Sequence, residues 1–212
     1  IHDTGEGAPA FLDASLGGTN YGYGTTLAGQ EAYREFQNNT VGLDVGVDSY
    51  SISLYTGLNF SESVPASGRY HIYNGNFGAN FGHIRVGTEG ESLAWEAYDN
   101  TAGWQEIGIS LATDKAYYIE FVINTAASNY DITVSQVNTD GSVVESGSLV
   151  GLEVGHLNPN EYGKLGFHLE ASAGTANFAV DNINISSVPE PEAFAAVMGL
   201  GFLAITLMRR KR

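Results

Sequence analysis

The sequence predicts an all-β fold, a two-sheet antiparallel jelly-roll sandwich, followed by a single C-terminal hydrophobic helix. Along most of the chain apolar and polar residues alternate, which is the side-chain period of β-strands. The 212 residues include 27 glycines, and many of them separate the alternating stretches as turn residues do. Near the C-terminus the pattern changes to an uncharged apolar run at 193–208.

About ten strands are expected before residue 187. A first strand is expected at 8–16, a glycine-rich loop at 17–29, and either a short helix or an edge strand at 29–36. The later expected strands are 49–58, 69–74, 83–88, 92–98, 105–111, 116–124, 130–138, 142–150, 164–171 and 176–186. So many strands without long helices require two packed sheets, because a single sheet would leave one apolar face in water.

Two features of the predicted strands are specific enough to test. Asp140 and Gly141 stand between alternating segments, which predicts a hairpin with a two-residue type I′ turn. The period of two also assigns the strand faces, and a set of large apolar residues on two neighbouring strands is expected to lie between the sheets. These residues are Ile119, Phe121, Ile123, Ile132 and Val134.

The charge balance argues against nucleic acid as a partner. Residues 188–212 hold four of the nine Lys and Arg and two of the 24 Asp and Glu. Residues 1–188 therefore carry five basic and 22 acidic side chains, a formal net charge of −17. Such a surface repels nucleic acid and anionic lipid. The absence of cysteine excludes disulfides and thiolate metal sites.

The C-terminal segment has three parts in a fixed order. A Pro189-Glu190-Pro191 triad precedes the apolar run 193–208, and four basic residues follow it, Arg209, Arg210, Lys211 and Arg212. As a helix the run would be about 24 Å long, slightly short of a ~30 Å hydrocarbon core. This order resembles the PEP-CTERM sorting tail. The resemblance implies that an exosortase, a membrane-embedded processing enzyme, recognises and removes the tail. The alternative is an ordinary C-terminal membrane anchor.

These observations predict four segments. They are a β-sandwich at 1–186, a linker with the Pro-Glu-Pro motif at 187–192, a transmembrane sorting helix at 193–208 and a basic cytoplasmic tail at 209–212. We expect an exported protein, anchored in a cell-envelope membrane by the helix or released to the cell surface or matrix after processing. The chain begins at Ile1, so a signal peptide is expected to have preceded it.

The sandwich itself resembles a known fold group. The hairpin run 116–144 and the closing segments 163–172 and 174–186 are similar to strands of the concanavalin A-like lectin, glucanase and laminin-G-like jelly rolls. The resemblance implies a fold and leaves the function open, because this fold carries many functions. Three alternatives remain: a non-enzymatic domain that binds polysaccharide, a glycoside hydrolase or polysaccharide lyase, and a purely structural surface protein. A domain that is not an enzyme is favoured.

Enzyme motifs of this fold group are missing or incomplete. The Glu-x-Asp-x-(x)-Glu motif of family 16 glycoside hydrolases does not occur, and Glu96 is interpreted as a solvated surface acid. An alginate-lyase motif is matched in its first half by Tyr162, Lys164 and Gly166, but His168 and Glu170 replace its second half. The five histidines show no compact ligand spacing, although His71 and His83 could meet across a hairpin.

Aromatic residues beside carboxylates give the best ligand-binding hypothesis. Period-two geometry places Trp104 with Glu106, and Tyr98 with Glu96, on faces opposite the apolar side chains, and Tyr118 also points away from the core. Exposed rings beside carboxylates are suited to sugars, and the acidic charge favours a neutral polysaccharide. The alternative is that these rings are buried under loops.

A structural calcium ion is the cofactor to consider. The domain is rich in oxygen ligands, and related jelly rolls often bind Ca²⁺ near the position of Asp181 in the last strand. No spacing of acidic residues specifies a site.

Overall fold

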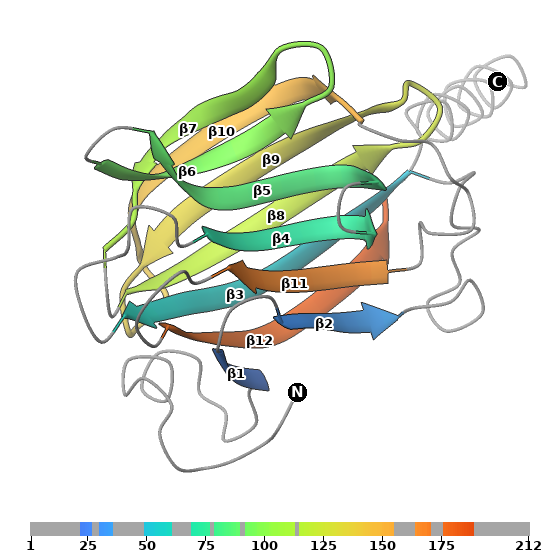
Figure 1. The fold of residues 1–212 in the computed structure, drawn as a ribbon. Coiled ribbons are helices and arrows are strands. Elements are labelled where there is room, and N and C mark those ends of the chain that lie inside the picture. Colours follow the sequence, from blue (N-terminus) through green and yellow to red (C-terminus); the bar gives the residue numbers. More distant parts are fainter. Residues whose placement is uncertain are drawn as a thin grey trace, which may run out of the picture.

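The computed structural model describes residues 22–26, 30–35, 49–60, 69–76, 79–89, 92–112, 115–154, 164–170 and 176–188. These residues form twelve strands in two six-stranded antiparallel sheets (Figure 1). Sheet A runs in the order β1 (Gly22–Thr26), β12 (Ala176–Ser187), β3 (Tyr50–Phe60), β8 (Ala116–Asn124), β9 (Asn129–Val137) and β10 (Val143–Glu153). Sheet B runs in the order β2 (Gln30–Glu35), β11 (Lys164–Glu170), β4 (Arg69–Asn76), β5 (Ala79–Glu89), β6 (Ser92–Asp99) and β7 (Gly103–Ser110).

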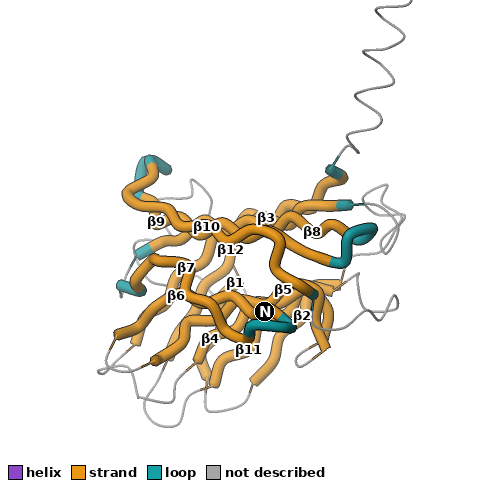
Figure 2. Tube along the Cα trace, turned by 90° about the horizontal axis from the view of Figure 1, so that it is seen from above, coloured by secondary structure: helices purple, strands orange, loops and turns teal. Residues whose placement is uncertain are grey.

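The two sheets lie face to face as separate layers (Figure 2). The side chains that meet between them come from alternate positions of each strand, as the strand period requires. The five residues predicted to lie there are each 1% exposed or less, which confirms the assignment of strand faces. Trp95 of β6 is fully buried in the same layer, with its ring centroid 5.3 Å from that of Tyr117 on β8.

Buried polar side chains link the two sheets through the core. The Tyr50 hydroxyl on β3 donates to Asn74 Oδ1 on β4 at 2.6 Å, and Asn74 Nδ2 donates to the Lys164 carbonyl on β11 at 2.8 Å. Thr56 Oγ1 lies 3.0 Å from the Tyr70 hydroxyl, and burial raises the pKa of Tyr70 so that this hydroxyl stays neutral. Because a buried polar group is costly without a partner, these bonds fix how sheet B sits on sheet A.

One of the two N-terminal strands differs from the sequence-based expectation, and the other agrees with one of its two alternatives. Residues 22–26, expected within a glycine-rich loop, form β1 and pair with β12 at the edge of sheet A. Residues 30–35, expected as either a short helix or an edge strand, form β2 and pair with β11 over six residues. The backbone ladder to the distant strand β12 decided β1, so local composition could not identify it. The edge-strand alternative for 29–36 is the one that the structure shows. The first expected strand, 8–16, lies outside the described residues.

The β9–β10 hairpin lies where Asp140 and Gly141 predicted it, but the turn type was wrong. Gly141 has a φ of +80°, whereas Asp140 is not among the residues with positive φ, so a type I′ turn is excluded. The Gly141 amide donates to the Asn138 carbonyl, and the Asn138 amide donates to the Ser142 carbonyl. This is a longer loop with a left-handed glycine, the next most common hairpin connection.

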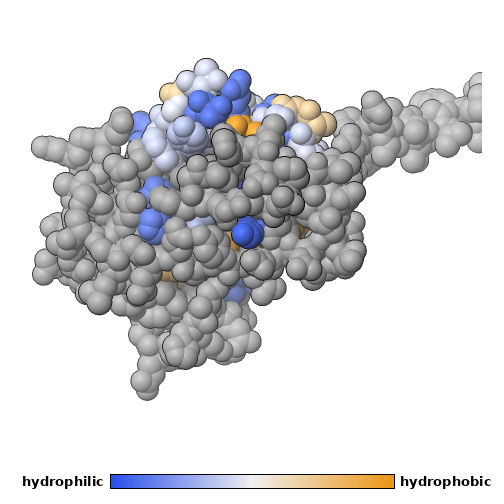
Figure 3. Space-filling view, turned by 45° about the vertical axis from the view of Figure 1, so that its right-hand side comes forward, coloured by the Kyte–Doolittle hydropathy of each residue, from blue (hydrophilic) through white to orange (hydrophobic). Residues whose placement is uncertain are grey.

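The edge strand β10 carries the exposed large hydrophobic side chains of the described residues, Val143, Val144 and Val150. The described surface visible at the top of Figure 3, where Figure 1 places the β7 and β10 edge, is mostly hydrophilic with a few hydrophobic atoms. The β9–β10 ladder is interrupted at two places, between Val143 and Glu145 and between Leu149 and Leu152. Such irregularities hinder an edge strand from pairing with another chain.

β12 ends at Ser187, and the Val188 amide donates to the Ser49 carbonyl at 2.9 Å. The last described residue is therefore still tied to sheet A. The predicted sorting helix and basic tail lie outside the described residues. Within the described part, no helix long and apolar enough to cross a membrane is found.

Candidate ligand-binding face

The outer face of sheet B, which points away from sheet A, gathers aromatic, histidine and acidic side chains. The alternation that buries Trp95, Ile72 and Phe167 against sheet A sends their neighbours to this opposite side. We call it the sheet B face. It comprises His71 and Tyr73 of β4, Glu96 and Tyr98 of β6, Trp104 and Glu106 of β7, and His168 of β11.

The β6–β7 hairpin brings together four residues that the sequence analysis selected. Tyr98 lies directly opposite Trp104, and Glu96 directly opposite Glu106. The two rings meet edge to face, with centroids 5.2 Å apart, an arrangement favoured by the ring quadrupoles. The two rings thus form one cross-strand pair, and the two carboxylates form the adjacent pair of the same hairpin.

A short turn fixes the register of this hairpin. Asp99 Oδ1 accepts hydrogen bonds from the amides of Thr101 and Ala102 at 2.9 and 2.7 Å. Asp99 Oδ2 accepts from the Glu153 amide at 3.0 Å, which ties the turn to β10 of sheet A. The amide of Ala102, followed by those of Glu153 and Thr101, holds the pKa of Asp99 below its usual value despite some desolvation. The Tyr130 hydroxyl donates to the Tyr98 carbonyl at 2.5 Å from the core side.

The rings of the sheet B face form a continuous group across four strands. His71 and His168 stack with centroids 5.7 Å apart, and His71 meets Trp104 edge to face at 6.1 Å. β4 and β7 are separated by β5 and β6, so their backbones lie roughly 14 Å apart along the sheet. The Trp104 and His71 rings therefore lean toward each other over the intervening strands.

Burial differs sharply among these residues. Glu96, interpreted from the sequence as a solvated surface acid, is only 2% exposed, so that interpretation was wrong. Alternation predicts which face a side chain is on, but it does not predict how exposed that side chain is. Trp104 and Tyr98 are half-buried, and Glu106 is exposed. The face thus combines a shielded carboxylate, two partly open rings and a carboxylate in contact with water.

Strand registers place further charged residues in the same row. Arg85 of β5 lies opposite both His71 and Glu96, and Glu31 of β2 lies opposite His168. His71 and His83, which could have met across a hairpin, do not lie opposite each other, because His83 lies opposite Tyr73 in the register. His71 stacks on His168, which lies 97 positions later in the chain.

Gly166 of β11 makes room for an aromatic ring on this face. Tyr73 is fully buried, and a Cβ atom added to Gly166 would clash with the end of its ring. The Tyr73 ring therefore lies over the β11 backbone at Gly166, in the space that a side chain at position 166 would occupy. Lys164, Gly166 and His168, noted for an incomplete alginate-lyase motif, lie at alternate positions of β11, and Tyr162 is outside the described residues.

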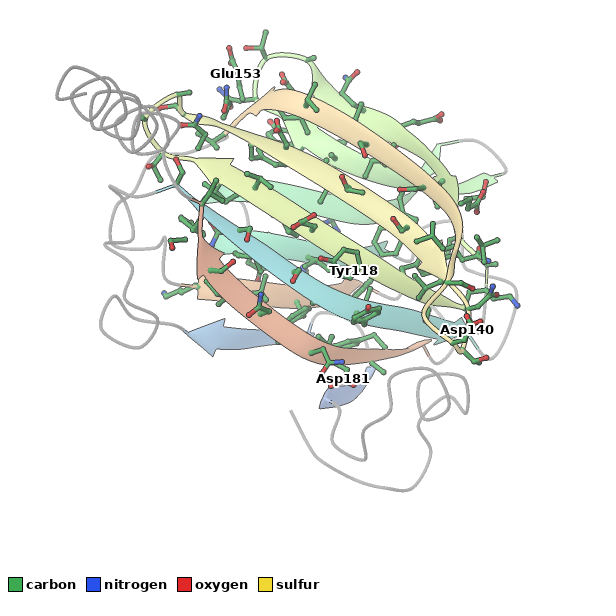
Figure 4. The ribbon with its side chains drawn as sticks, turned by 180° about the vertical axis from the view of Figure 1, so that it is seen from behind. Tyr118, Asp140, Glu153 and Asp181 are labelled. Atoms are coloured by element: carbon green, nitrogen blue, oxygen red, sulfur yellow. The ribbon has the colours of Figure 1, made fainter. Side chains whose placement is uncertain are left out.

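Tyr118 is separated from the other predicted ligand-binding residues. It lies on β8 of sheet A, and its ring packs against Tyr55 of β3 with centroids 5.1 Å apart. Figure 4 views the molecule from the sheet A side and labels Tyr118 together with Asp181 of β12. Asp181 lies opposite Tyr55, so these residues belong to the other side of the sandwich from Trp104.

The calcium hypothesis gains no geometric support from the described strands. Asp181 Oδ1 accepts a hydrogen bond from the Asn182 amide at 2.7 Å. Asn182 has a φ of +50° at an irregularity of the β12–β3 ladder. Nowhere in the described ranges do three or more His, Cys, Asp or Glu residues come together as a metal site would need. Calcium at Asp181 stays a prediction.

Sequence reasoning did not select His71, Tyr73 and His168 for this face. Alternation does predict that His71 and His168 point to the outer face. Their sequence neighbours Tyr70, Ile72 and Phe167 are buried between the sheets. What the sequence could not supply was the strand order, which places β11 beside β4.

No protein-family model and no curated protein matches the chain. Several solved structures match it. The β-glucanase catalytic domain of glycoside hydrolase family 131 from Podospora anserina aligns with 86% of this chain and 78% of its own, at 13% identity and a TM-score of 0.54. The described strands thus have a jelly-roll β-sandwich fold similar to that of this domain. Identity this low establishes the fold alone.

Two other structures match less closely. The family 131 catalytic domain from Coprinopsis cinerea aligns with 69% of this chain at 9% identity and a TM-score of 0.49. The alignment spans 59% of the Coprinopsis chain, less than two thirds of its length. The seed lectin of Lotus tetragonolobus aligns over 68% of this chain and 75% of its own at 9% identity and a TM-score of 0.43.

Proposed function

We propose that the sheet B face binds a neutral polysaccharide and that the protein acts at the cell surface or in the extracellular matrix. The observation that carries the proposal is the convergence of Tyr98, Trp104 and His71 beside Glu96 and Glu106. The β-glucanase of similar fold acts on a glucan, which makes β-glucan a reasonable first ligand to test.

The chemistry of the face suits a sugar chain. Partly open indole and phenol rings offer apolar surface to the C–H groups of a pyranose ring, and carboxylates accept hydrogen bonds from its hydroxyls. Charge-assisted hydrogen bonds of this kind are stronger than neutral ones. The acidic surface, with 24 Asp and Glu against nine Lys and Arg, disfavours a polyanionic glycan.

A retention experiment tests this proposal. The full chain, purified in a mild detergent, is passed over immobilised β-glucan, xylan, galactomannan and alginate. We expect retention on at least one neutral polysaccharide and none on alginate. Trp104→Ala should abolish retention while the midpoint of thermal unfolding changes by only a few degrees, since Trp104 is half-buried on an outer face.

Tyr118→Ala provides the matched control, because Tyr118 is a half-buried ring on the opposite face. It should leave retention unchanged. If Tyr118→Ala abolishes retention and Trp104→Ala does not, the ligand binds to sheet A and the proposal is wrong. If the native chain is retained on no glycan, the structural role becomes the better hypothesis.

The second part of the proposal concerns sorting. We propose that an exosortase-type enzyme processes the chain within 188–212 and that the apolar run 193–208 holds it in a membrane until then. The ordered Pro-Glu-Pro triad, apolar run and basic cluster support this. Intact-mass measurement of the protein from an exosortase-bearing host tests it: the mature chain should lack Arg212. A mature chain that still ends in Arg212 would contradict cleavage and leave the anchor.

A further inference from the structure

The edge strand β10 has a nearly palindromic sequence. Residues 144–150 read Val-Glu-Ser-Gly-Ser-Leu-Val, so that serine and valine recur at equal distances on both sides of Gly147. We propose that two copies of this chain form a dimer by antiparallel pairing of β10 with β10, centred on Gly147. In this dimer the two copies of sheet A form one continuous sheet, and both sheet B faces lie on the same side of it.

The position of β10 in the fold leaves one side of this strand open. β10 is the last strand of sheet A, and Figure 4 shows it along that edge, with Asp140 and Glu153 near its two ends. β9 is its ladder partner among the described strands, so alternate amides and carbonyls on the other side of β10 point away from the sheet. Val144 and Val150 on this strand are 52% and 76% exposed. The edge therefore offers both unpaired backbone and apolar side chains to a second strand.

Two interruptions of the β9–β10 ladder limit how far this edge can pair. One falls at Val144, and the other falls at 150–151. The five residues between them, 145–149, pair regularly with β9. Bulges disrupt a ladder locally and re-aim side chains, so pairing with another chain is hindered beyond these two points. The regular stretch that remains is framed by the two exposed valines.

The side-chain period and the valines together select one register. Directly opposite residues of an antiparallel pair point to the same face, so a shift by one residue would turn one copy over relative to the other. The register centred on Gly147 places Val144 of each copy opposite Val150 of the other, and Ser146 opposite Ser148. Moving the centre to Ser146 or Ser148 would separate the valines.

Sheet B supports β10 at the proposed centre of the dimer. A Cβ atom added to Gly147 would overlap the Ile107 carbonyl oxygen of β7, so the two backbones are in direct contact there. Any larger residue at this position would push β10 away from sheet B. A strand that is already held in place does not have to become ordered on association, which lowers the cost of binding.

The charges of the chain weaken this dimer and leave the contact itself compatible. The formal net charge is −15, so two copies repel each other. Within the paired stretch Glu145 lies opposite Leu149 of the other copy, and the two glutamates do not face each other. Raising the salt from about 0.01 to about 0.1 M shortens the Debye length from about 30 to about 10 Å and should strengthen the dimer. A contact of one strand is small beside the ~800 Å² per partner of a standard interface, so we expect reversible association.

The dimer would bring two binding faces together. Because directly opposite residues share a face, the two sheet B faces point to the same side. β7, which carries Trp104, lies against β10 in each copy, so the two faces adjoin at the dimer axis. This consequence rests on the proposed function: a polysaccharide that occupies both faces should be held about 10²–10⁴-fold more tightly than by one face.

Cysteine cross-linking of the full chain tests the register, because the native sequence contains no cysteine. Val144→Cys and Val150→Cys are prepared separately, and both positions are exposed, so neither change disturbs the core. Mixed under mild oxidation, the two variants should form a disulfide-linked dimer, since directly opposite residues lie within the Cα separation of about 4.4–6.8 Å that a disulfide spans. Either variant alone should link far less, because the same position in the two copies is about 20 Å apart, six residues along the strand.

The control is Val144→Cys mixed with Asn184→Cys, an exposed position on β12, which should not link. Linking confined to the mixture of Val144→Cys with Val150→Cys supports the dimer. Equal linking in every sample, or none in any, would overturn it. The assay contains no polysaccharide, so its result does not depend on the proposed function.

A charge swap tests the link to binding. Val144→Glu places a carboxylate against Val150 of the other copy, so it should prevent dimerisation in sedimentation velocity and weaken retention on the polysaccharide about 100-fold. Adding Val150→Lys should restore both, because each new carboxylate then faces an ammonium group. Native retention by the monomeric Val144→Glu variant would overturn the joint action of the two faces. Dimers that are retained on no polysaccharide would overturn the proposed function and leave the dimer.

Discussion

The outer faces of the two sheets are built on the same strand period and carry different kinds of side chain. On sheet A short hydroxyl side chains pair across strands: Ser51 with Ser186, Thr133 with Ser148, and Ser135 with Ser146, at 2.8–2.9 Å. On sheet B long rings and carboxylates lean across strands toward one another, as the 6.1 Å contact of His71 with Trp104 shows.

The difference indicates how a sandwich assigns stability and binding to separate surfaces. A hydroxyl that is hydrogen-bonded to its cross-strand neighbour uses part of its hydrogen-bonding capacity within the sheet and adds little apolar surface for a ligand. Rings and carboxylates that converge from several strands present apolar surface and hydrogen-bond acceptors at one place. Sheet A also contains aromatic residues, but Tyr55 and Tyr118 pack against Ala116, Val137 and Ala179 as a small cluster.

The largest expected effect concerns the core that both faces share. Phe121 is fully buried, with its ring centroid 6.3 Å from that of Tyr130. Phe121→Ala should lower the free energy of unfolding by about 3–5 kcal/mol, because it leaves a cavity between the sheets. Denaturant titration measures this. A loss below about 1 kcal/mol would mean that the inner and outer faces are exchanged.

A smaller effect is expected where Tyr73 crosses β11. Gly166→Ala should cost about 1–3 kcal/mol by overpacking, because the new Cβ displaces the Tyr73 ring. It should also weaken retention on the polysaccharide, since the displaced ring disturbs the sheet B face. A double-mutant cycle with Tyr73→Ala provides the control: without the ring, Gly166→Ala should cost much less. Equal costs in both backgrounds would show that the ring is not responsible.

Asp99 should contribute about 1 kcal/mol to the free energy of unfolding, and this contribution should depend on pH. Asp99→Asn keeps one acceptor but removes the oxygen that accepts from the Glu153 amide. Its pKa is lowered in the folded state, chiefly by the Ala102 amide, so its contribution is complete above its unfolded pKa near 3.9. The stability difference between native and variant chains should be constant above about pH 5 and shrink as the pH falls below about 4. A difference that persists undiminished to pH 2 would contradict this.

The smallest effect is expected on sheet A. Thr133→Val removes the contact with the Ser148 hydroxyl, an exposed cross-strand pair, and should cost about 0.2–1 kcal/mol. Retention on the polysaccharide should not change. If Thr133→Val weakens retention as much as Trp104→Ala does, the functional difference between the two faces is lost.

The sequence predicted the sandwich and one half of the site. Alternation identified the face that carries Trp104 with Glu106 and Tyr98 with Glu96, because the two strands form one hairpin. His71 and His168 reach that face from strands that are distant in sequence, so their contact depends on strand order, which local patterns do not encode. The burial of Glu96 was missed because alternation assigns a face and not a degree of exposure. Tyr118 was grouped with Trp104 because alternation does not tell which sheet a strand joins.

The chain contains two tryptophans, and they make the central claim directly measurable. Trp95 is buried between the sheets, and Trp104 lies on the sheet B face. With 5-fluorotryptophan in both positions, fluorine NMR gives two signals, which Trp104→Phe assigns. Titration with the retained polysaccharide should shift the Trp104 signal and leave the Trp95 signal in place. A Trp104 signal that stays unchanged while the protein is saturated with polysaccharide would show that the ligand binds elsewhere.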